Sequence, residues 1–482
     1  VHITEGFAES NISEKYYEPP LMQVIPSACD MCEDNKIEVS NMCHGCVAHP
    51  CMEVCPKEAI SMVDGHAFVD QDKCIKCGKC IAICPYHAII KKIRPCAEAC
   101  GINAIESDEH GRAKINDEKC VSCGQCMASC PFGAIADKSQ IFQMIRAIQH
   151  GDEVIAEIAP AFEGQFGADV TPAQVIAALK ECGFKDVHEV ALGADIGAVS
   201  EAHHYVKEVV NGDLPFLLTS CCPAWIKYAE NEYPEILPNI STCRSPMQMF
   251  ASVINEKFKG EGKKILSVAV MPCTAKKGEA ARDEFKDENG KPLVDFVITT
   301  QELIMMIKEA GIVFNEIEPE AVDMPFGTMT GAGVIFGVTG GVTEAVIRRV
   351  STDKSLASLR NLAFEGVRGF EGIKELEVPL GDKAIKVCVV NGLRNVEVIM
   401  NRMKAGEHFD LIEVMACPNG CIGGAGQPKA TIDEKKERSV NLYNADKLCT
   451  LKRSEENPLM DKLYEGILKG REHELLHVSY VK

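Results

Sequence analysis

Beyond about residue 150, the spacing of hydrophobic and polar residues predicts an α/β body. Apolar runs bounded by turn residues, such as DEVIAEIAP at 152–160 and FDLIEVMA at 409–416, are typical of buried strands. Helical periodicity, as in TQELIMMIKEAG at 300–311, alternates with these runs. The alternation predicts parallel sheets with crossover helices, and the length of the region favours two lobes. Other strands are predicted at 185–192, 215–220, 264–271, 294–300 and 383–392, and other helices at 395–406 and from Pro172 to 182, the latter capped by Thr171.

The first third of the chain is dominated by cysteine. Of the 25 cysteines in the sequence, sixteen lie between Cys29 and Cys130. The N-terminal residues VHITEGFAES do not resemble a secretory signal, so a disulfide scaffold is disfavoured and metal binding is favoured. We therefore expect a reducing, anaerobic cytoplasm. The segments HAII at 87–90 and GAIA at 133–136 suit the short strands of α+β ferredoxin-like domains.

Composition and charge narrow the classes of function. The 482 residues are 46% hydrophobic and 25% charged, which is typical of a soluble globular protein of about three domains. A net charge of −19 argues against nucleic acids and anionic membranes as partners. Because no apolar run reaches the roughly 18 residues of a membrane span, no membrane insertion is expected.

Two cysteine runs have the spacing of bacterial iron–sulfur proteins. CIKCGKCIAICP at 74–85 and CVSCGQCMASCP at 120–131 both follow C-x2-C-x2-C-x3-C-P, in which the fourth cysteine ligates the partner cluster. Zinc sites instead use two separated pairs of ligands, which leaves the third cysteine and the proline without a role. A variant run, CHGCVAHPCMEVCP at 43–56, precedes the first and pairs with it as one two-cluster unit.

A second two-cluster unit is predicted to surround the first. The run at 120–131 has no partner run directly before it. Cys29-x2-Cys32 and Cys96-x3-Cys100 together supply that partner, with 43–84 inserted between them. The alternative is that Cys29 and Cys32 are structural thiols and that only three clusters form. The crossing rule gives four ligand sets, which are Cys43, Cys46, Cys51 and Cys84; Cys55, Cys74, Cys77 and Cys80; Cys29, Cys32, Cys96 and Cys130; and Cys100, Cys120, Cys123 and Cys126.

Three predicted strands of the body also run into cysteines. PFLLTS at 215–220 is followed by Cys221 and Cys222, KILSVAVM by Cys273, and FDLIEVMA by Cys417 with Cys421 just beyond. Ligands of open α/β sheets bind beyond the carboxyl ends of strands, so these thiols are expected to converge on one site between the lobes. The alternative for any single one of them is a small core residue.

Three loops carry a resemblance to a known family. TSCCPAW at 219–225, MPCTAKKGE at 271–279 and EVMACPNGCIGGAGQP at 413–428 resemble the signature loops of the iron-only, or FeFe, hydrogenases. The match spans about residues 140–482. The resemblance implies an H-cluster, in which a 4Fe-4S cubane is joined through a cysteine sulfur to a two-iron unit that carries CO, cyanide and an azadithiolate bridge. The implied cubane ligands are Cys222, Cys273, Cys417 and Cys421, with Cys421 as the bridge.

The resemblance also implies roles for four neighbours of the cluster. Cys221 would pass protons to the bridgehead amine, and a thiol, with an ordinary pKa near 8.5, holds a proton at neutral pH. Lys276 would contact a cyanide ligand, Met415 would pack against the two-iron unit, and Phe336 would line the same pocket. The glycines between Gly423 and Gly426 are expected to leave room for the cluster beside the backbone.

The family's proton route carries over only in part. Glu201 and Ser241 occupy the places of a family glutamate and a family serine, but the second family glutamate is His204 here. Histidine relays protons with an ordinary pKa near 6.5; the alternative is that His203 and His204 are surface residues and protons travel elsewhere. Three further residues, Met247, Ala161 and Ala425, differ from those that family members often have at these places. They change the surroundings of the cluster and bear on the rate and preferred direction of the reaction.

We therefore predict a hydrogenase that interconverts two protons, two electrons and H2. Four additional 4Fe-4S clusters would relay electrons from ferredoxin or a similar carrier, entering at the 43–84 unit, and maturation proteins would assemble the two-iron unit. The alternatives are an uptake enzyme or low-activity H2 sensor, an iron–sulfur assembly protein without the two-iron unit, and a pure electron-transfer module. The predicted domains are an extension at 1–28, the iron–sulfur region at 29–140, and the H-cluster domain at 141–482 with a C-terminal tail from about 430.

Overall fold

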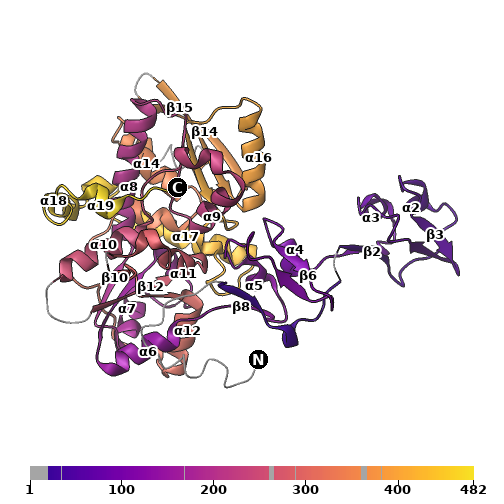
Figure 1. Ribbon diagram of the computed structural model, residues 1–482, viewed down its shortest axis with the longest axis horizontal. Helices are drawn as coiled ribbons and strands as arrows, with labels where there is room; N and C mark the ends of the chain where they lie inside the picture. The colour runs from indigo at the N-terminus through magenta and orange to yellow at the C-terminus, as the bar shows by residue number, and fades with distance from the viewer. Residues whose placement is uncertain are drawn as a thin grey trace. The chain divides into compact units, whose positions relative to one another are not determined.

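The computed structural model describes residues 20–33, 35–167, 169–259, 265–287, 289–355, 357–359, 366–380 and 383–481 (Figure 1). Most of the predicted extension at 1–28 therefore lies outside the described residues. The chain forms two compact units. The larger one contains Lys119–Gly124 and Asp137–Lys482 with the N-terminal residues up to Met22, and the smaller one contains Gln23–Glu118 and Gln125–Ala136.

The first sheet of the larger unit is entirely parallel. Its strand order is β10-β9-β12-β13, with β9 at Glu153–Ile158, β10 at Asp186–Glu189, β12 at Ile265–Met271 and β13 at Phe296–Thr299. Both faces are buried and mostly apolar, as expected for a parallel sheet that helices cover on each side, with Glu157 of β9 and Ser267 of β12 among the buried polar exceptions. The covering helices include α7 (Pro172–Glu181), α10 (Pro246–Phe258) and α12 (Thr300–Glu309). Thr171 caps α7 through a capping box with Gln174, as its position before Pro172 predicts.

One predicted strand is too long at its carboxyl end. The apolar run at 185–192 forms β10 only as far as Glu189, and the buried helix α8 (Ala191–Tyr205) begins two residues later. Small residues on α8 permit a close helix approach, since a Cβ on Gly193 would lie 2.4 Å from the Pro246 carbonyl oxygen of α10. A helix buried on all sides has no polar face, so its sequence lacks the amphipathic signal that separates it from a strand.

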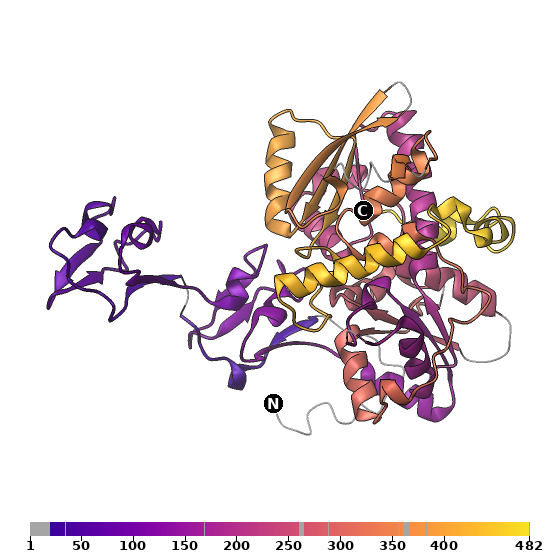
Figure 2. The same ribbon diagram turned by 180° about the vertical axis from the view of Figure 1, so that it is seen from behind.

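The second sheet of the larger unit is mixed. Its order is β11-β16-β15-β14, and β11 (Leu217–Leu218), β16 (Leu411–Met415) and β15 (Lys383–Asn391) run parallel. β14 (Ile373–Leu380) pairs antiparallel with β15 at the edge and was not predicted. The prediction of an α/β body with parallel sheets is confirmed, apart from this edge strand. Figures 1 and 2 show the two sheets in separate lobes of the larger unit.

A C-terminal helix packs on the segments between the lobes. α17 (Ile432–Leu448) runs across the middle of the larger unit in Figure 2. It contacts α13 (Gly331–Val334) and the short helices η7 (Ile335–Gly337) and η9 (Cys421–Gly423). The predicted tail from about 430 thus begins with a helix that holds the loops containing Phe336 and Cys421.

The smaller unit consists of two-stranded ribbons and short helices, the α+β pattern predicted for ferredoxin-like domains. The ribbons pair β1 (Met22–Val24) with β8 (Ile135–Asp137), β2 (Lys36–Val39) with β5 (Ile89–Lys92), β3 (Ile60–Val63) with β4 (His66–Val69), and β6 (Ile105–Ser107) with β7 (Ala113–Ile115). The helices are α2 (Pro50–Glu53), α3 (Lys79–Ile83), α4 (Pro95–Glu98) and α5 (Gln125–Ser129). β2 and β5 flank 43–84 and pair antiparallel, so the chain enters and leaves this segment at neighbouring points. No helix among the described residues is both long enough and apolar enough to cross a membrane.

Candidate active site

Strand ends deliver five thiols to one cavity in the larger unit. β11 is followed by Cys221 and Cys222, β12 by Cys273 and β16 by Cys417. Cys421 begins the short helix η9, and Cys222 is the N-cap of α9 (Pro223–Glu232). All five cysteines line a cavity of about 770 Å³. The sheets therefore bring together the sulfurs that the sequence separates by up to 200 residues, as the rule for strand carboxyl ends predicts.

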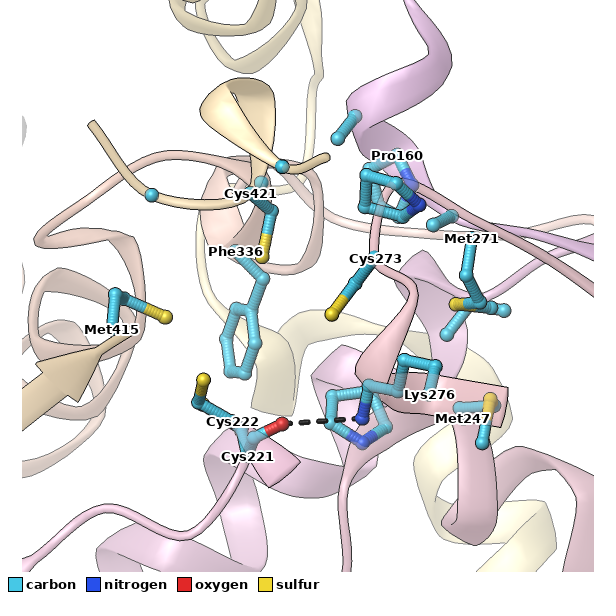
Figure 3. A pocket seen from close by; sticks show the side chains of 18 of the residues that line it. Pro160, Cys221, Cys222, Met247, Met271, Cys273, Lys276, Phe336, Met415 and Cys421 are labelled. Carbon is cyan, nitrogen blue, oxygen red and sulfur yellow. Dashed lines mark hydrogen bonds between the residues drawn. The ribbon is translucent and has the colours of Figure 1, made fainter. Parts of the chain in front are cut away.

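The remainder of the cavity wall is mostly apolar. Phe336, Met415 and Met247 belong to it, and Lys276 is the one charged residue among the described lining residues. Figure 3 shows the sulfurs of Cys273, Cys421 and Met415 turned toward the space beside Phe336. Ala161 also lines the cavity, so two of the predicted departures lie where they affect its polarity.

The grouped thiols disfavour one another's charge. Burial raises the pKa of Cys273 to about 11 and that of Cys421 to about 12, and the neighbouring Cys222 adds to both shifts. Burial also raises the pKa of Cys417 well above its ordinary value, with Cys273 nearby. Thiolates placed so close together need positive charge between them, which an iron–sulfur core supplies to its ligands. Four thiols around one cavity therefore fit a cubane.

A single metal ion fits this arrangement less well. Within the described parts of the chain, no group of three or more Cys, His, Asp or Glu side chains is arranged to hold one ion. Thiols around a cubane lie farther apart than thiols around one ion, so the two observations agree. The roles of Cys222, Cys273, Cys417 and Cys421 as cluster ligands stay predictions.

Lys276 is held in place from two sides. Its Nζ donates to the Cys221 carbonyl oxygen at 3.2 Å and to Glu279 Oε2 at 2.8 Å (Figure 3 draws the first). Burial opposes its charge, but Glu279 and the nearby thiols outweigh burial and raise the pKa of Lys276 above its ordinary value. Lys276 therefore stays protonated at the cavity wall and fixes the backbone of Cys221.

The glycine-rich loop after Cys421 has a different purpose from the one expected. A Cβ on Gly423 would lie 2.1 Å from the Pro418 carbonyl oxygen, and one on Gly424 would lie 2.2 Å from the Pro272 carbonyl oxygen. The expectation that these glycines leave room for a cluster is thus corrected, because protein backbone already occupies that space. Glycine here lets the loop of Cys421 pack directly on the loop of Cys273.

An iron–sulfur loop lies against the cavity loops inside the larger unit. Thr274 Oγ1 donates to the Ser122 carbonyl oxygen at 2.7 Å, and a Cβ on Gly124 would lie 2.6 Å from the Cβ of Ala425. Cys123 is also among the neighbours that raise the pKa of Cys417. The methyl group of Ala425, one of the predicted departures, therefore faces Gly124 at this contact.

Glu201, Ser241 and His204 form a hydrogen-bonded row behind the cavity. Ser241 Oγ donates to Glu201 Oε2 at 2.8 Å and lies 3.1 Å from His204 Nδ1. Burial raises the pKa of Glu201 to about 7, and hydrogen bonds from Ser241 and Cys243 limit the shift. Glu201 Oε1 is buried without a hydrogen-bond partner among the described residues. The described contacts include no hydrogen bond between Glu201 and Cys221.

The row continues into residues that the sequence analysis missed. His477, near the C-terminus, places its ring edge-on to His204, with ring centroids 6.2 Å apart. His477 Nδ1 lies 3.0 Å from Thr242 Oγ1, next to Ser241 in the chain. More than 230 residues separate the partners, and no motif marks His477, so only the folded chain shows the contact.

Two cavities of the smaller unit gather cysteines in predicted sets. One is lined by Cys29, Cys32, Cys96 and Cys130, and the other by Cys55, Cys74, Cys77 and Cys80. Burial raises the pKa of Cys51, and Cys46 and Cys84 lie close enough to add to the shift. Cys43 Sγ accepts from the backbone N–H of Ala67 at 3.5 Å. The ligand roles of all four sets, including that of Cys100, Cys120, Cys123 and Cys126, stay predictions.

Four C-x2-C turns, Cys29-x2-Cys32 and the first turn of each of the three cysteine runs, share one backbone conformation. The residue before the second cysteine has a positive φ in these four, with values of 51° at Met31, 56° at Gly45, 58° at Lys76 and 56° at Ser122. Non-glycine residues rarely adopt this conformation. Cys29 and Cys32 thus form the same turn as the three other pairs, which favours a ligand role over that of incidental structural thiols.

Sequence families cover nearly the whole described chain. The family described as "Iron only hydrogenase large subunit, C-terminal domain" matches residues 152–425, and "Iron hydrogenase small subunit" matches 432–482. A third, "LdpA Fe-S cluster-binding domain", matches 43–94 and 91–141. The large-subunit match alone spans more than half of the chain.

Individual relatives agree with the family matches. The NADP-reducing hydrogenase subunit HndD of Solidesulfovibrio fructosivorans is 37% identical over 86% of this chain and 74% of its own length. Iron hydrogenase 1 of Clostridium pasteurianum is 36% identical over 89% of this chain and 78% of its own length. An apo structure of the FeFe-hydrogenase HydA1 from Chlamydomonas reinhardtii has a TM-score of 0.61 at 31% identity, covering 71% of this chain and 99% of that one.

Proteins of another class are also similar. Cytosolic iron-sulfur assembly component 3 of Rattus norvegicus is 30% identical over 67% of this chain and 72% of its own length. The family matches and the hydrogenases above cover more of the chain at higher identity. The chain belongs to the iron-only, or FeFe, hydrogenase family.

Proposed function

We propose that this protein is a working FeFe hydrogenase that interconverts protons, electrons and H2. The observation that carries the proposal is a single cavity that joins the four predicted cubane ligands to Cys221 and Lys276. A protein that only held or transferred an iron–sulfur cluster would need the four ligands alone. The additional thiol and the fixed ammonium group are the groups that chemistry on H2 requires, since one moves protons and the other stabilises negative charge.

The residues of the cavity divide into two sets by role. Cys222, Cys273, Cys417 and Cys421 would hold the cubane, with Cys421 reaching toward the two-iron unit. Lys276 and Met415 would bind and orient that unit, and Phe336 would exclude water. The bound H-cluster supplies the iron at which H2 is split or formed and the redox change that accompanies it. The apolar wall strengthens electrostatic interactions inside the cavity.

Protons would move between the cavity and Ser241 through Cys221 and Glu201. Ser241 already donates to Glu201 Oε2, which leaves Oε1 as the oxygen that faces the remaining step. A water molecule between Oε1 and the Cys221 thiol is the expected bridge, because a buried carboxylate oxygen needs a partner. Ser241 then passes the proton to His204 Nδ1.

Electrons would enter at the cluster set of Cys55, Cys74, Cys77 and Cys80. Cys77 is exposed, unlike the buried Cys80. Lysines Lys57, Lys76 and Lys79 line the same cavity, and no acidic residue does so among its described lining. Residues 43–94 carry seven Lys or Arg against five Asp or Glu, in a chain whose net charge is −19. We call Lys57, Lys76 and Lys79 the basic collar. Its positive charge suits an acidic one-electron carrier such as ferredoxin.

Reversing the charge of the three lysines of the basic collar is expected to weaken electron transfer from an acidic ferredoxin. In a Lys57→Glu, Lys76→Glu, Lys79→Glu variant, KM for ferredoxin should rise about tenfold at low ionic strength, and the difference should shrink as salt screens the charges. Activity with reduced methyl viologen should not change. Lys114→Glu is a control outside the collar, and its KM should match that of the wild type. Equal KM values for wild type and triple variant would contradict the proposed entry point.

Infrared spectroscopy tests the function itself. After maturation in a host that supplies the assembly proteins, the protein is expected to show CO and cyanide stretching bands and to evolve H2 from reduced methyl viologen. The same host carrying Cys417→Ala, which removes a predicted cubane ligand, is the control and should lose the bands. A wild-type protein with full iron content but no such bands would support an assembly or electron-transfer role instead.

A further inference from the structure

A row of three histidines leads outward from Ser241. His204 Nδ1 faces Ser241 Oγ at 3.1 Å, which leaves Nε2 for the next partner. The ring of His477 stands at 88° to the ring of His204, at a centroid distance of 6.2 Å. The ring of His473 stacks on His477 at 5.5 Å and 18°. His204 and His477 are partly buried and His473 is exposed, so the row connects the protein interior with solvent.

His477 is fixed from both sides of its residue. Its Nδ1 lies 3.0 Å from Thr242 Oγ1, and its carbonyl oxygen accepts a hydrogen bond from Arg244 Nε at 3.0 Å. The backbone N–H of Val478 donates to the Thr242 carbonyl oxygen at 2.7 Å. These bonds attach the C-terminal segment to the stretch that contains Ser241. Because Nδ1 is engaged, Nε2 is the atom left to exchange protons with His204 or with water.

We propose that His477 and His473 form the outer part of the proton path, between His204 and solvent. The inference rests on the proposed function and goes beyond it, since it assigns the exit of the path to the C-terminal segment. Nε2 of His477 takes up a proton that comes from His204 and then gives it to His473 or to water, so the ring returns to its starting state after each transfer. The centroid distance between His204 and His477 leaves room for a direct contact or one bridging water.

Burial lowers the pKa of His477 and of His204, so both rings are neutral at pH 7. His477 faces His204, His473, Arg244 and Lys207, and burial together with these cationic or potentially cationic groups lowers the pKa of His477 to about 4. Burial lowers the pKa of His204, and Glu208 and Lys207 act on it in opposite directions. Neutral imidazoles pass protons onward instead of retaining them, which suits the middle of a relay.

The alternative is that the histidines only anchor the C-terminal segment. His477→Gln separates the two roles, because an amide can keep a hydrogen bond to Thr242 but cannot carry a proton. With reduced methyl viologen as donor, H2 evolution by His477→Gln is expected to fall about tenfold, below the 10²–10⁴-fold effect of a group at the reaction itself. Added imidazole should restore much of the rate, because a free imidazole can carry the proton past the missing ring. His150→Gln, an exposed histidine in another helix, is the control.

A second measurement does not depend on turnover. In the purified protein without the two-iron unit, NMR titration of the histidine ring protons should show that His204→Gln raises the pKa of His477 from about 4, because His204 is one of the neighbours that lower it. This pKa measurement does not depend on turnover. A wild type that produced no H2 would remove the proposed function and leave the pKa result unchanged. An unchanged rate of H2 evolution in His477→Gln would overturn the inference. So would a loss of rate that added imidazole does not restore, or an unchanged pKa of His477 in His204→Gln.

Discussion

Cys221→Ala is expected to lower H2 turnover by about a thousandfold, within the range for removal of a group that transfers protons in the reaction. Cys221 lines the cavity beside the four predicted ligands, and its backbone is fixed by Lys276 at 3.2 Å. Burial raises the pKa of its thiol well above the ordinary value, so the group is protonated in the absence of a cluster. Alanine removes the proton carrier but leaves the backbone contact and the ligand thiols.

The expected signature is loss of turnover with the metal centre retained. Iron content and the infrared bands of the matured protein should match the wild type, and rates should be measured with reduced methyl viologen to bypass the protein partner. Cys388→Ala is the matched control, because Cys388 is a buried thiol of β15 outside the cavity lining. Its variant should keep its turnover. Undiminished turnover in Cys221→Ala would remove the thiol from the path.

Glu201→Gln is expected to lower turnover by at least about a hundredfold and to remove one pH dependence. Because burial raises the pKa of Glu201 to about 7, the wild-type carboxyl group is mostly protonated below pH 7 and mostly ionised above it. Delivery of protons for H2 evolution needs the acid form, so the wild-type rate of evolution should fall as pH rises through 7. The rate of H2 oxidation, which needs a proton acceptor, should rise over the same interval. Glutamine has neither form and should show neither inflection.

The raised pKa of Glu201 also makes the free energy of unfolding depend on pH. Between the ordinary pKa of 4.5 and the folded value of about 7, the folded state binds more protons than the unfolded state, so this group lowers the free energy of unfolding as pH rises through that interval. Glu201→Gln should therefore gain stability relative to the wild type between pH 4 and pH 8, as measured by urea denaturation. Glu397→Gln, at an exposed position, is the control and should show no such trend. Wild-type turnover in Glu201→Gln would exclude Glu201 from the proton path.

Local sequence patterns predicted much of the body and the grouping of the five cysteines around one cavity. Buried parallel strands have continuous apolar runs, so β9, β12 and β16 could be placed within a few residues from the sequence alone. Cys273 follows β12 and Cys417 follows β16, and ligands of open α/β sheets bind beyond the carboxyl ends of strands, so the convergence of these thiols was expected. The C-x2-C spacings were equally clear in the sequence, whereas the positive φ shared by four of these turns was seen only in the folded chain.

Features that depend on distant contacts were not visible in the sequence. β14 alternates buried Leu376 and Val378 with exposed glutamates, a weak signal at a sheet edge. The start of α8 was read as strand because a fully buried helix is apolar on every side. The glycines after Cys421 were assigned to the cluster, although they serve the packing of one loop on another. His477 joins the site only through the fold, so no spacing within the chain marks it.

The antiparallel pairing of β2 with β5 places the two ends of the inner iron–sulfur segment, residues 43–84, side by side. Entry and exit of the chain are adjacent, so the segment between them can be gained or lost in evolution without rerouting the polypeptide on either side. Because the predicted ligands of this segment form two cluster sets, its gain or loss would lengthen or shorten the predicted electron path by two clusters, while the predicted chemistry in the larger unit would stay the same. The choice of redox partner and the catalytic core are thereby free to diverge separately.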